Sequence, residues 1–339
     1  MRRITIGLIG AGRIGKLHAE HLAWRIPDAE LVAVADSRLE AAKEVAAACG
    51  VDVAVEDYRV ILENPAIEAV VICASTYMHA QMIEEAAIAG KHIFCEKPID
   101  HDLAKIDKAL AVVDSAGVKL QIGFMRRFDT NFRRVRDMVA SGKIGTPHML
   151  RIISCDPEPP SIEYIKVSGG IFLDMVIHDF DMARFLIGSE VSEIYATGAA
   201  LVDPEIGKAG DIDTAAAVLR FENGVVGTIN NSRKAVYGHD QRVEVLGSGG
   251  MAATSNNTSD GTIYSNADSV HTAPPMWFFI ERYTDAYIAE MIEFIECVRE
   301  GKTPSVTGSD GRVPVVMGHA AKKSFEENRP VRLSEIDAG

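Results

Sequence analysis

Three glycines near the start of the chain constrain its fold more than any other feature. They stand in Gly10-Ala11-Gly12-Arg13-Ile14-Gly15, after the apolar run 4–9 and before a segment with helical spacing over 14–24. In a strand–turn–helix unit of this kind, the glycines allow a tight turn, backbone approach to a pyrophosphate, and close packing of helix on strand. The helix N-terminus then offers unpaired N–H groups to the phosphates. The pattern predicts a dinucleotide-binding unit.

A carboxylate follows at the spacing that this unit requires. Residues 31–35 form a second apolar strand, and Asp36 stands at its end. A carboxylate there binds the ribose hydroxyls and repels a 2′-phosphate, so the sequence predicts NAD rather than NADP. Arg38 leaves NADP open, because a nearby arginine can accept that phosphate. A structural glycine turn with a capping aspartate is the weaker alternative.

The order of strands and helices predicts two domains. Apolar strands alternate with helices through about residue 123, which is typical of a doubly wound parallel sheet. Beyond residue 145, longer strands with few helices between them are expected at 148–155, 191–202, 214–221, 225–231 and 242–247. We therefore expect an α/β chain with a Rossmann domain over 1–123. A substrate-binding α+β domain with a large, mostly antiparallel sheet is expected over 124–339.

Composition narrows the class of protein. The 339 residues carry a formal net charge of −13, with no long basic run. Because a nucleic-acid binder needs a basic face, we expect a small-molecule substrate and no nucleic-acid partner. Five cysteines without a Cys-x-x-Cys pair indicate reduced thiols in the cytoplasm and no zinc site. No apolar run reaches the roughly 20 residues that span a bilayer, so no membrane partner is expected.

A lysine lies where a ligand is expected to bind. Glu96-Lys97-Pro98 follows the apolar strand at 92–95. In an open α/β sheet, ligands bind at the carboxyl ends of the strands, so Lys97 is placed where a cofactor and a substrate can meet. A single lysine in a loop is also commonly just a surface residue.

A second polar pattern favours the functional interpretation. Within residues 169–179, Asp174 and His178 are four positions apart and would share one face of a helix. Their neighbours are apolar, and burying a carboxylate and an imidazole there costs free energy unless the two groups are paired or serve a function. A carboxylate also orients an imidazole and favours its charged form. The alternative is a purely structural Asp–His pair.

Together, these patterns resemble the glucose–fructose oxidoreductase/inositol dehydrogenase family, often written Gfo/Idh/MocA. The resemblance covers essentially the whole chain. Segments 122–130, 156–168 and 231–238 are particularly similar to the bacterial inositol 2-dehydrogenases of that family.

The resemblance implies roles for individual residues. Lys97 would bridge cofactor and substrate, His178 would be the general base, and Asp174 would orient it. Cofactor contacts are expected from Gly10, Ala11, Gly12, Arg13, Ile14, Gly15, Asp36, Ser37, Arg38, Ser75, Thr76, His79, Glu96 and Lys97. Substrate contacts are expected from Lys97, Arg127, Asp156, Asp174, His178, Tyr237 and Tyr283. The family also implies a homotetramer formed through the sheet of the second domain.

These roles predict NAD-dependent oxidation of a secondary hydroxyl of a cyclic polyol, with inositol the first choice. His178 would take the hydroxyl proton while Lys97 holds the reacting oxygen, although Lys97 beside a cationic nicotinamide could itself be the base. Two alternatives remain: a sugar such as an aldose as substrate, and a non-catalytic NAD-binding sensor. The sensor is disfavoured because both Lys97 and His178 are present.

Overall fold

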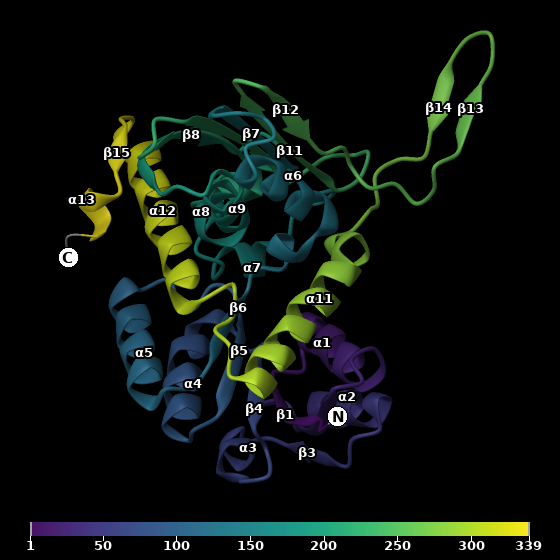
Figure 1. The fold of residues 1–339 in the computed structure, drawn as a ribbon, viewed down its shortest axis with the longest axis vertical. Coiled ribbons are helices and arrows are strands. Elements are labelled where there is room, and N and C mark those ends of the chain that lie inside the picture. Colours follow the sequence, from purple (N-terminus) through teal and green to yellow (C-terminus); the bar gives the residue numbers. More distant parts are fainter. Residues whose placement is uncertain (1, 338–339) are drawn as a thin grey trace. The chain divides into compact units, whose positions relative to one another are not determined.

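The computed structural model describes residues 2–337, which form two compact units (Figure 1). One unit takes the chain up to Met125 together with Asp285–Val313, and the other takes Arg126–Thr284 and the chain from Pro314 onward. The order of helices and strands and the two large sheets confirm the expected fold class. The first unit extends beyond the expected boundary at 123, because it includes a late segment of the chain.

The first unit is built on a six-stranded parallel sheet in the order β3-β2-β1-β4-β5-β6. Its strands are β1 (Ile4–Ile9), β2 (Ala29–Ala35), β3 (Val53–Val55), β4 (Ala69–Ile72), β5 (His92–Glu96) and β6 (Leu120–Gly123). The helices between them are α1 (Arg13–Trp24), α2 (Leu39–Cys49), α3 (Arg59–Glu63), α4 (Thr76–Ile88) and α5 (Leu103–Ala116). This is the dinucleotide-binding order, whose ligand site lies at the carboxyl ends of the strands beside the switch from β1 to β4.

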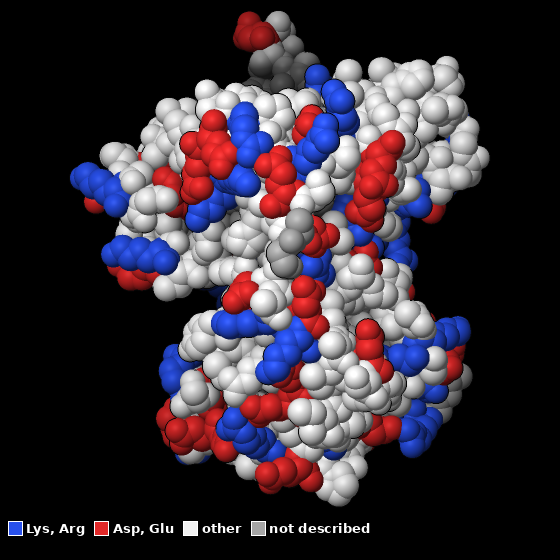
Figure 2. All heavy atoms as spheres, turned by 90° about the vertical axis from the view of Figure 1, so that its left-hand side faces the viewer, with Lys and Arg blue, Asp and Glu red and all other residues white. Residues whose placement is uncertain are grey.

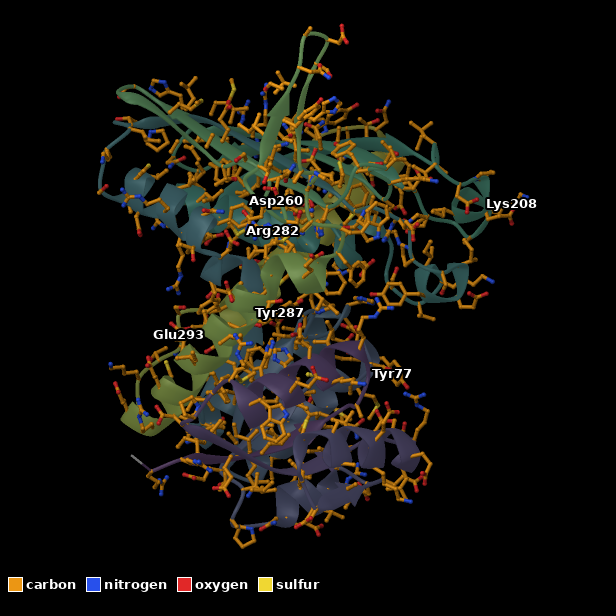
Figure 3. All side chains as sticks on the ribbon, turned by 90° about the vertical axis from the view of Figure 1, so that its right-hand side faces the viewer. Tyr77, Lys208, Asp260, Arg282, Tyr287 and Glu293 are labelled. Carbon is orange, nitrogen blue, oxygen red and sulfur yellow. The ribbon has the colours of Figure 1, made fainter. Side chains whose placement is uncertain are left out.

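Helix α11 (Phe279–Glu300) explains the difference in the domain boundary. Its residues Met291, Phe294 and Ile295 are buried in the same core as the strands of the parallel sheet. Figure 3 shows α11 with Arg282 near its start and Tyr287 and Glu293 further along. The apolar face of this helix is visible in the sequence, but the core that it joins is set by contacts distant in the chain.

The second unit contains a seven-stranded sheet in the order β12-β11-β7-β10-β9-β8-β15. Its strands are β7 (Pro147–Cys155), β8 (Val191–Ala199), β9 (Thr214–Phe221), β10 (Val226–Ser232), β11 (Asp240–Gly247), β12 (Gly250–Ala253) and β15 (Val331–Arg332). All neighbours are antiparallel except β7 and β10, which confirms the mostly antiparallel sheet. Besides the start of α11, the helices and the 3₁₀ turn that lie wholly or partly in this unit are η1 (Met125–Phe128), α6 (Thr130–Ala140), α7 (Ile162–Ile165), α8 (Ile171–Asp174), α9 (Ile177–Ile187), α10 (Pro204–Lys208), α12 (Gly308–Glu327) and α13 (Ser334–Asp337).

One face of this sheet presents apolar side chains to solvent. Exposed side chains line up across four strands through the pairs Met251–Leu246, Leu246–Met149 and Met149–Val226. Buried positions alternate with them, as expected when the other face packs against helices. A separate hairpin of β13 (Ile263–Ser265) and β14 (Val270–Thr272) projects from this unit (Figure 1).

The surface carries charges of both signs. In Figure 2, basic and acidic side chains are interspersed on the visible face rather than gathered by sign. Among the described residues, no helix has both the length and the apolar character needed to cross a membrane.

Candidate active site

The three fingerprint glycines occupy different environments. Gly10 has φ +101°, and a Cβ there would lie 2.5 Å from the backbone of Cys73. At Gly15 a Cβ would lie 1.8 Å from the carbonyl oxygen of Gly10, so this position admits no side chain. Gly12 has nothing within 4 Å, which leaves the backbone at the start of α1 open to a phosphate. The geometry therefore matches the three roles expected from the sequence.

Asp36 is fixed at the end of β2 beside this loop. One carboxylate oxygen accepts a hydrogen bond from the Ala11 N–H at 2.8 Å, and the other accepts one from the Arg38 N–H at 2.8 Å. The Arg38 guanidinium lies 3.8 Å from the same carboxylate and is largely exposed. The carboxylate expected to select NAD is thus tied directly to the loop expected to hold the pyrophosphate. Ser37 lies exposed between Asp36 and Arg38.

His79 connects two loops at the carboxyl edge of the parallel sheet. Ser75 occupies the N-cap position of α4 without a side-chain capping hydrogen bond, and Thr76 begins the helix. From the first turn of α4, the His79 ring lies 2.9 Å from the carbonyl oxygen of Ala74 and 2.8 Å from that of Pro98. Burial lowers the pKa of His79, and the two carbonyl contacts oppose that shift. The imidazole thereby links the loop after β4 to the loop that carries Lys97.

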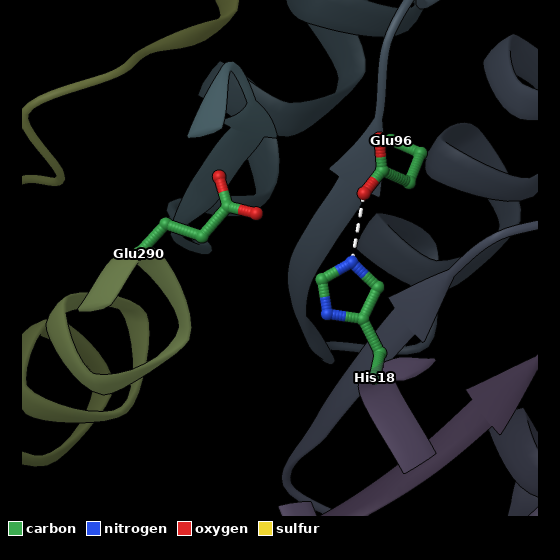
Figure 4. A group of neighbouring side chains, drawn as sticks. All are labelled: His18, Glu96 and Glu290. Carbon is green, nitrogen blue, oxygen red and sulfur yellow. Dashed lines mark hydrogen bonds and ion pairs between the residues drawn. The ribbon is translucent and has the colours of Figure 1, made fainter. Parts of the chain in front are cut away.

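Lys97 directly follows Glu96, the buried last residue of β5, whose side chain is hydrogen-bonded to His18 (Figure 4). Glu96 accepts a hydrogen bond from His18 of α1 at 2.7 Å, with the His18 side chain fully buried. Lys97 is partly exposed, and its peptide bond to Pro98 is cis. The pair connects the strand end before Lys97 to the helix that begins at the glycine fingerprint.

Glu290 of α11 points toward this pair (Figure 4). Ligand atoms of His18, Glu96 and Glu290 lie within 4.8 Å of one another. Burial, reinforced by the nearby Glu96, raises the pKa of Glu290 well above its usual value. A proton held by Glu290 would relieve the repulsion between the two neighbouring carboxylates.

The structure corrects the single helix expected for Asp174 and His178. Asp174 ends α8, His178 lies in the first turn of α9, and the helical pairing is interrupted at Met175 and Val176. The His178 N–H donates to the Met175 carbonyl at 3.4 Å. His178 is 9% exposed. Both residues belong to the second unit, whereas Lys97 belongs to the first.

Asp174 has two hydrogen-bond donors in place. The Tyr164 hydroxyl donates to its Oδ1 at 2.8 Å, and Arg233 Nη1 donates to its Oδ2 at 3.1 Å. These contacts hold a carboxylate that the sequence alone placed in an apolar run. Asp156 lies in the same polar region, because Arg126, Arg233 and Asp174 all affect its titration. Burial is the largest effect and raises the pKa of Asp156 to about 6.

The other expected substrate ligands lie in different settings. Arg127 is buried and makes a bidentate ion pair with Asp181, at 2.6 and 2.9 Å. Tyr237 is half-exposed, and its hydroxyl donates to Asp240 at 2.7 Å. Tyr283 is 1% exposed. Of these residues, Tyr237 presents the most accessible side chain, whereas Arg127 is committed to a buried pair.

Sequence reasoning assigned no role to two buried groups near Asp156. Arg233 binds Asp174, and His239 places its Nε2 3.8 Å from Asp156 Oδ1. Burial, with Arg126 and Arg282 nearby, lowers the pKa of His239 to about 3, so its ring is neutral. Both residues lie in or next to the segment 231–238 that resembles the family. The sequence around Arg233 and His239 does not show which carboxylate each of them approaches.

Two family models match the chain. The model described as oxidoreductase family, NAD-binding Rossmann fold, matches residues 4–124, and the GFO/IDH/MocA C-terminal domain matches residues 132–253. The fold and the fingerprint define an oxidoreductase with an NAD-binding Rossmann domain and a separate α+β domain. The chain belongs to the GFO/IDH/MocA family, which confirms the resemblance and the expected cofactor.

Individual relatives match over nearly the full length. The chain is 48% identical over 333 residues to the myo-inositol 2-dehydrogenase of Thermotoga maritima, covering 98% of this chain and 99% of that one. The crystal structure of a probable dehydrogenase from Thermotoga maritima superposes with a TM-score of 0.96 at 48% identity, covering 98% and 100%. A scyllo-inositol dehydrogenase from Lactobacillus casei, crystallised with NAD(H) and scyllo-inositol, gives 0.92 at 31% identity, covering 98% and 100%.

Proposed function

We propose that the chain oxidises a secondary hydroxyl of myo- or scyllo-inositol to the corresponding inosose, with NAD as hydride acceptor. The full-length match at 48% identity to a myo-inositol 2-dehydrogenase carries this proposal. The partly buried carboxylates Asp156 and Asp174 support it, because a neutral polyol offers hydroxyl donors to such groups.

The first unit's own residues would hold the cofactor. The open backbone at Gly12 and the N-terminus of α1 would receive the pyrophosphate, and Asp36 the ribose hydroxyls. Ser75, Thr76 and His79 would line the nicotinamide side, next to the loop of Lys97. When bound, NAD supplies the hydride-accepting carbon.

In the proposed mechanism, His178 takes the proton from the substrate hydroxyl while the carbon loses its hydride. Lys97 donates a hydrogen bond to the same oxygen, and its charge stabilises the developing alkoxide. Asp174 orients His178 or a substrate hydroxyl. The alternative assigns proton removal to Lys97. The pH dependence of kcat in a folded His178→Ala variant separates the two, because loss of the base removes its ionisation from the profile.

The proposed substrate ligands divide by their contacts. Asp156, Asp174 and Tyr237 carry oxygens suited to direct hydrogen bonds with a polyol. Arg127, which is paired with Asp181, and the buried Tyr283 would instead hold the substrate-binding residues in place without direct contact with the polyol.

A substrate screen tests the function directly. NADH formation would be followed with myo-inositol, scyllo-inositol, D-chiro-inositol and both enantiomers of glucose. We expect the highest kcat/KM with an inositol. Preference for a glucose enantiomer would favour an aldose dehydrogenase, and NAD binding without turnover of any substrate would favour a sensor.

We also propose a homotetramer that acts in the cytoplasm. The exposed apolar row formed by Met251, Leu246, Met149 and Val226 supports self-association through the sheet, because such patches commonly mark protein interfaces. The free cysteines, among them the buried Cys49, Cys95 and Cys297, fit a reducing compartment.

A further inference from the structure

One buried guanidinium lies among several carboxylates of the second unit. Arg233 follows β10 and is 1% exposed. Its Nη1 lies 3.1 Å from Asp174 Oδ2, and its Nη2 lies 3.6 Å from Asp211 Oδ2. Arg233 also lowers the pKa of Asp156 against the larger effect of burial. Because neighbouring carboxylates repel one another, the buried cation beside them stabilises the group.

Asp174 is restrained on both of its oxygens. Tyr164 donates to Oδ1 and Arg233 to Oδ2, so the two donors together fix the rotation of the carboxylate. Tyr164 is half-exposed on the short helix α7, whereas Arg233 is buried. Arg233 is therefore the more rigid of the two restraints.

The same guanidinium is connected to the start of α8. Asp211, its second partner, accepts a hydrogen bond from the Ile171 N–H at 3.0 Å. Ile171 begins α8 and Asp174 ends it, so Arg233 is linked to both ends of this four-residue helix. Gly170 permits the contact: it has φ +85°, and a Cβ there would lie 3.1 Å from Asp211 Oδ1.

The backbone of Arg233 is anchored as well. Its N–H donates to the carbonyl oxygen of Asp213 at 2.8 Å. The Asp213 carboxylate accepts backbone hydrogen bonds from Leu201, Val202 and Asp203, at 2.8 to 3.0 Å. The side chain of Arg233 thus extends toward Asp174 from a backbone position that the sheet and its neighbouring loop hold in place.

We propose that Arg233 is a positioning residue for hydroxyl oxidation, acting on the substrate through Asp174, whose carboxylate it holds in one orientation. This inference rests on the proposed role of Asp174. Arg233 should therefore influence turnover and leave the affinity for NAD unchanged, because the fingerprint lies in the other unit.

A double-mutant cycle with Arg233→Met and Asp174→Asn tests this. In the otherwise unchanged enzyme, Arg233→Met should lower kcat roughly 10- to 100-fold, the scale of a misplaced reacting group, with KM for NAD unchanged. In the Asp174→Asn background it should lower kcat further by no more than about 2-fold, because the carboxylate on which it acts is gone. Arg233→Lys, which keeps the cation and is the variant less prone to misfold, should recover part of the loss.

Arg184→Met provides a matched control. Arg184 is also buried in the second unit and pairs with a carboxylate, Glu190, at 2.6 Å. It should lower the melting temperature and leave kcat per folded molecule unchanged in both backgrounds. Equal losses from Arg233→Met in the two backgrounds would overturn the inference alone. Normal turnover in folded Asp174→Asn would instead reject the assigned role of Asp174, and the inference with it.

Discussion

The backbone N–H of Ala11 donates a hydrogen bond to the carboxylate of Asp36 at 2.8 Å, so the phosphate loop and the proposed ribose ligand form one unit. The second carboxylate oxygen is held by the Arg38 N–H. Because both oxygens are held, the negative charge of Asp36 stays in place beside the phosphate loop. The contact gives the predicted preference for NAD a structural cause, with the exposed Arg38 as the group that could weaken it.

Asp36→Ser should narrow the cofactor preference. Removing the charge ends its repulsion of the 2′-phosphate, and about 1.4 kcal/mol of relief corresponds to a 10-fold change. We expect the ratio of kcat/KM for NAD to that for NADP to fall about 10-fold or more. Steady-state kinetics with both cofactors measures it. Arg38→Ala, as the comparison variant, should raise the ratio. Equal efficiency with both cofactors in the unmodified enzyme would refute the role of Asp36.

Glu290→Gln should remove a pH dependence of stability. The pKa of Glu290 is raised well above its usual value of 4.5, mainly by burial, so the folded state binds this proton more tightly than the unfolded chain does. Its stabilising effect is complete below pH 4.5 and is lost as the pH rises through the folded pKa. Each unit of pKa difference corresponds to about 1.4 kcal/mol. The variant, which cannot ionise, should therefore gain stability relative to the wild type as the pH rises.

Urea unfolding between pH 5 and pH 9 measures that gain. Glu296→Gln is the matched control, since Glu296 lies exposed on the same helix. Its difference from the wild type should stay nearly constant over this range. If the Glu290→Gln curve also ran parallel to that of the wild type, the buried carboxyl would not titrate as the structure indicates.

The sequence predicted the elements whose determinants are local. The fingerprint glycines and Asp36 follow from spacing within 27 residues, and the structure gives each glycine a matching environment. Arg127 pairs with Asp181, 54 positions away, and Arg233 pairs with Asp174, 59 positions away. The sequence therefore did not show which carboxylate each arginine would bind. The short α8–α9 break was also missed, because residues 175 and 176 are apolar and contain no helix-breaking residue.

A charge placed in the exposed apolar row should dissociate the proposed tetramer. Met149 pairs with both Leu246 and Val226 in this row, so Met149→Glu would bury a carboxylate against apolar side chains if the face is an interface. Light scattering should show four chains of 36.7 kDa for the wild type and a smaller species for the variant. Ile88→Glu, at an exposed position of α4, should remain tetrameric. A wild-type mass equal to one chain would reject the assembly.

Replacing Lys97 or His178 should remove most of the enzyme's turnover without preventing it from folding. Lys97 is partly exposed, so Lys97→Ala leaves no large cavity and should melt close to the wild type. We expect kcat to fall at least roughly 10²-fold in each single variant, the lower end for general base catalysis. NAD affinity should change little, because Gly12 and Asp36 are intact.

The double variant separates catalysis from stability. If Lys97 and His178 act on one hydroxyl, Lys97→Ala combined with His178→Ala should lose far less than the product of the two single losses. If the two substitutions act independently through structure, the loss in the double variant should equal the product of the two single losses. Activity should then follow the folded fraction measured by thermal unfolding. Lys91→Ala is the matched control, since the Lys91 ammonium binds the carbonyl oxygens of Asn64 and Ile67 in the same unit. It should lower the melting temperature and keep its turnover per folded molecule. Near-normal kcat in folded Lys97→Ala or His178→Ala would remove that residue from the mechanism.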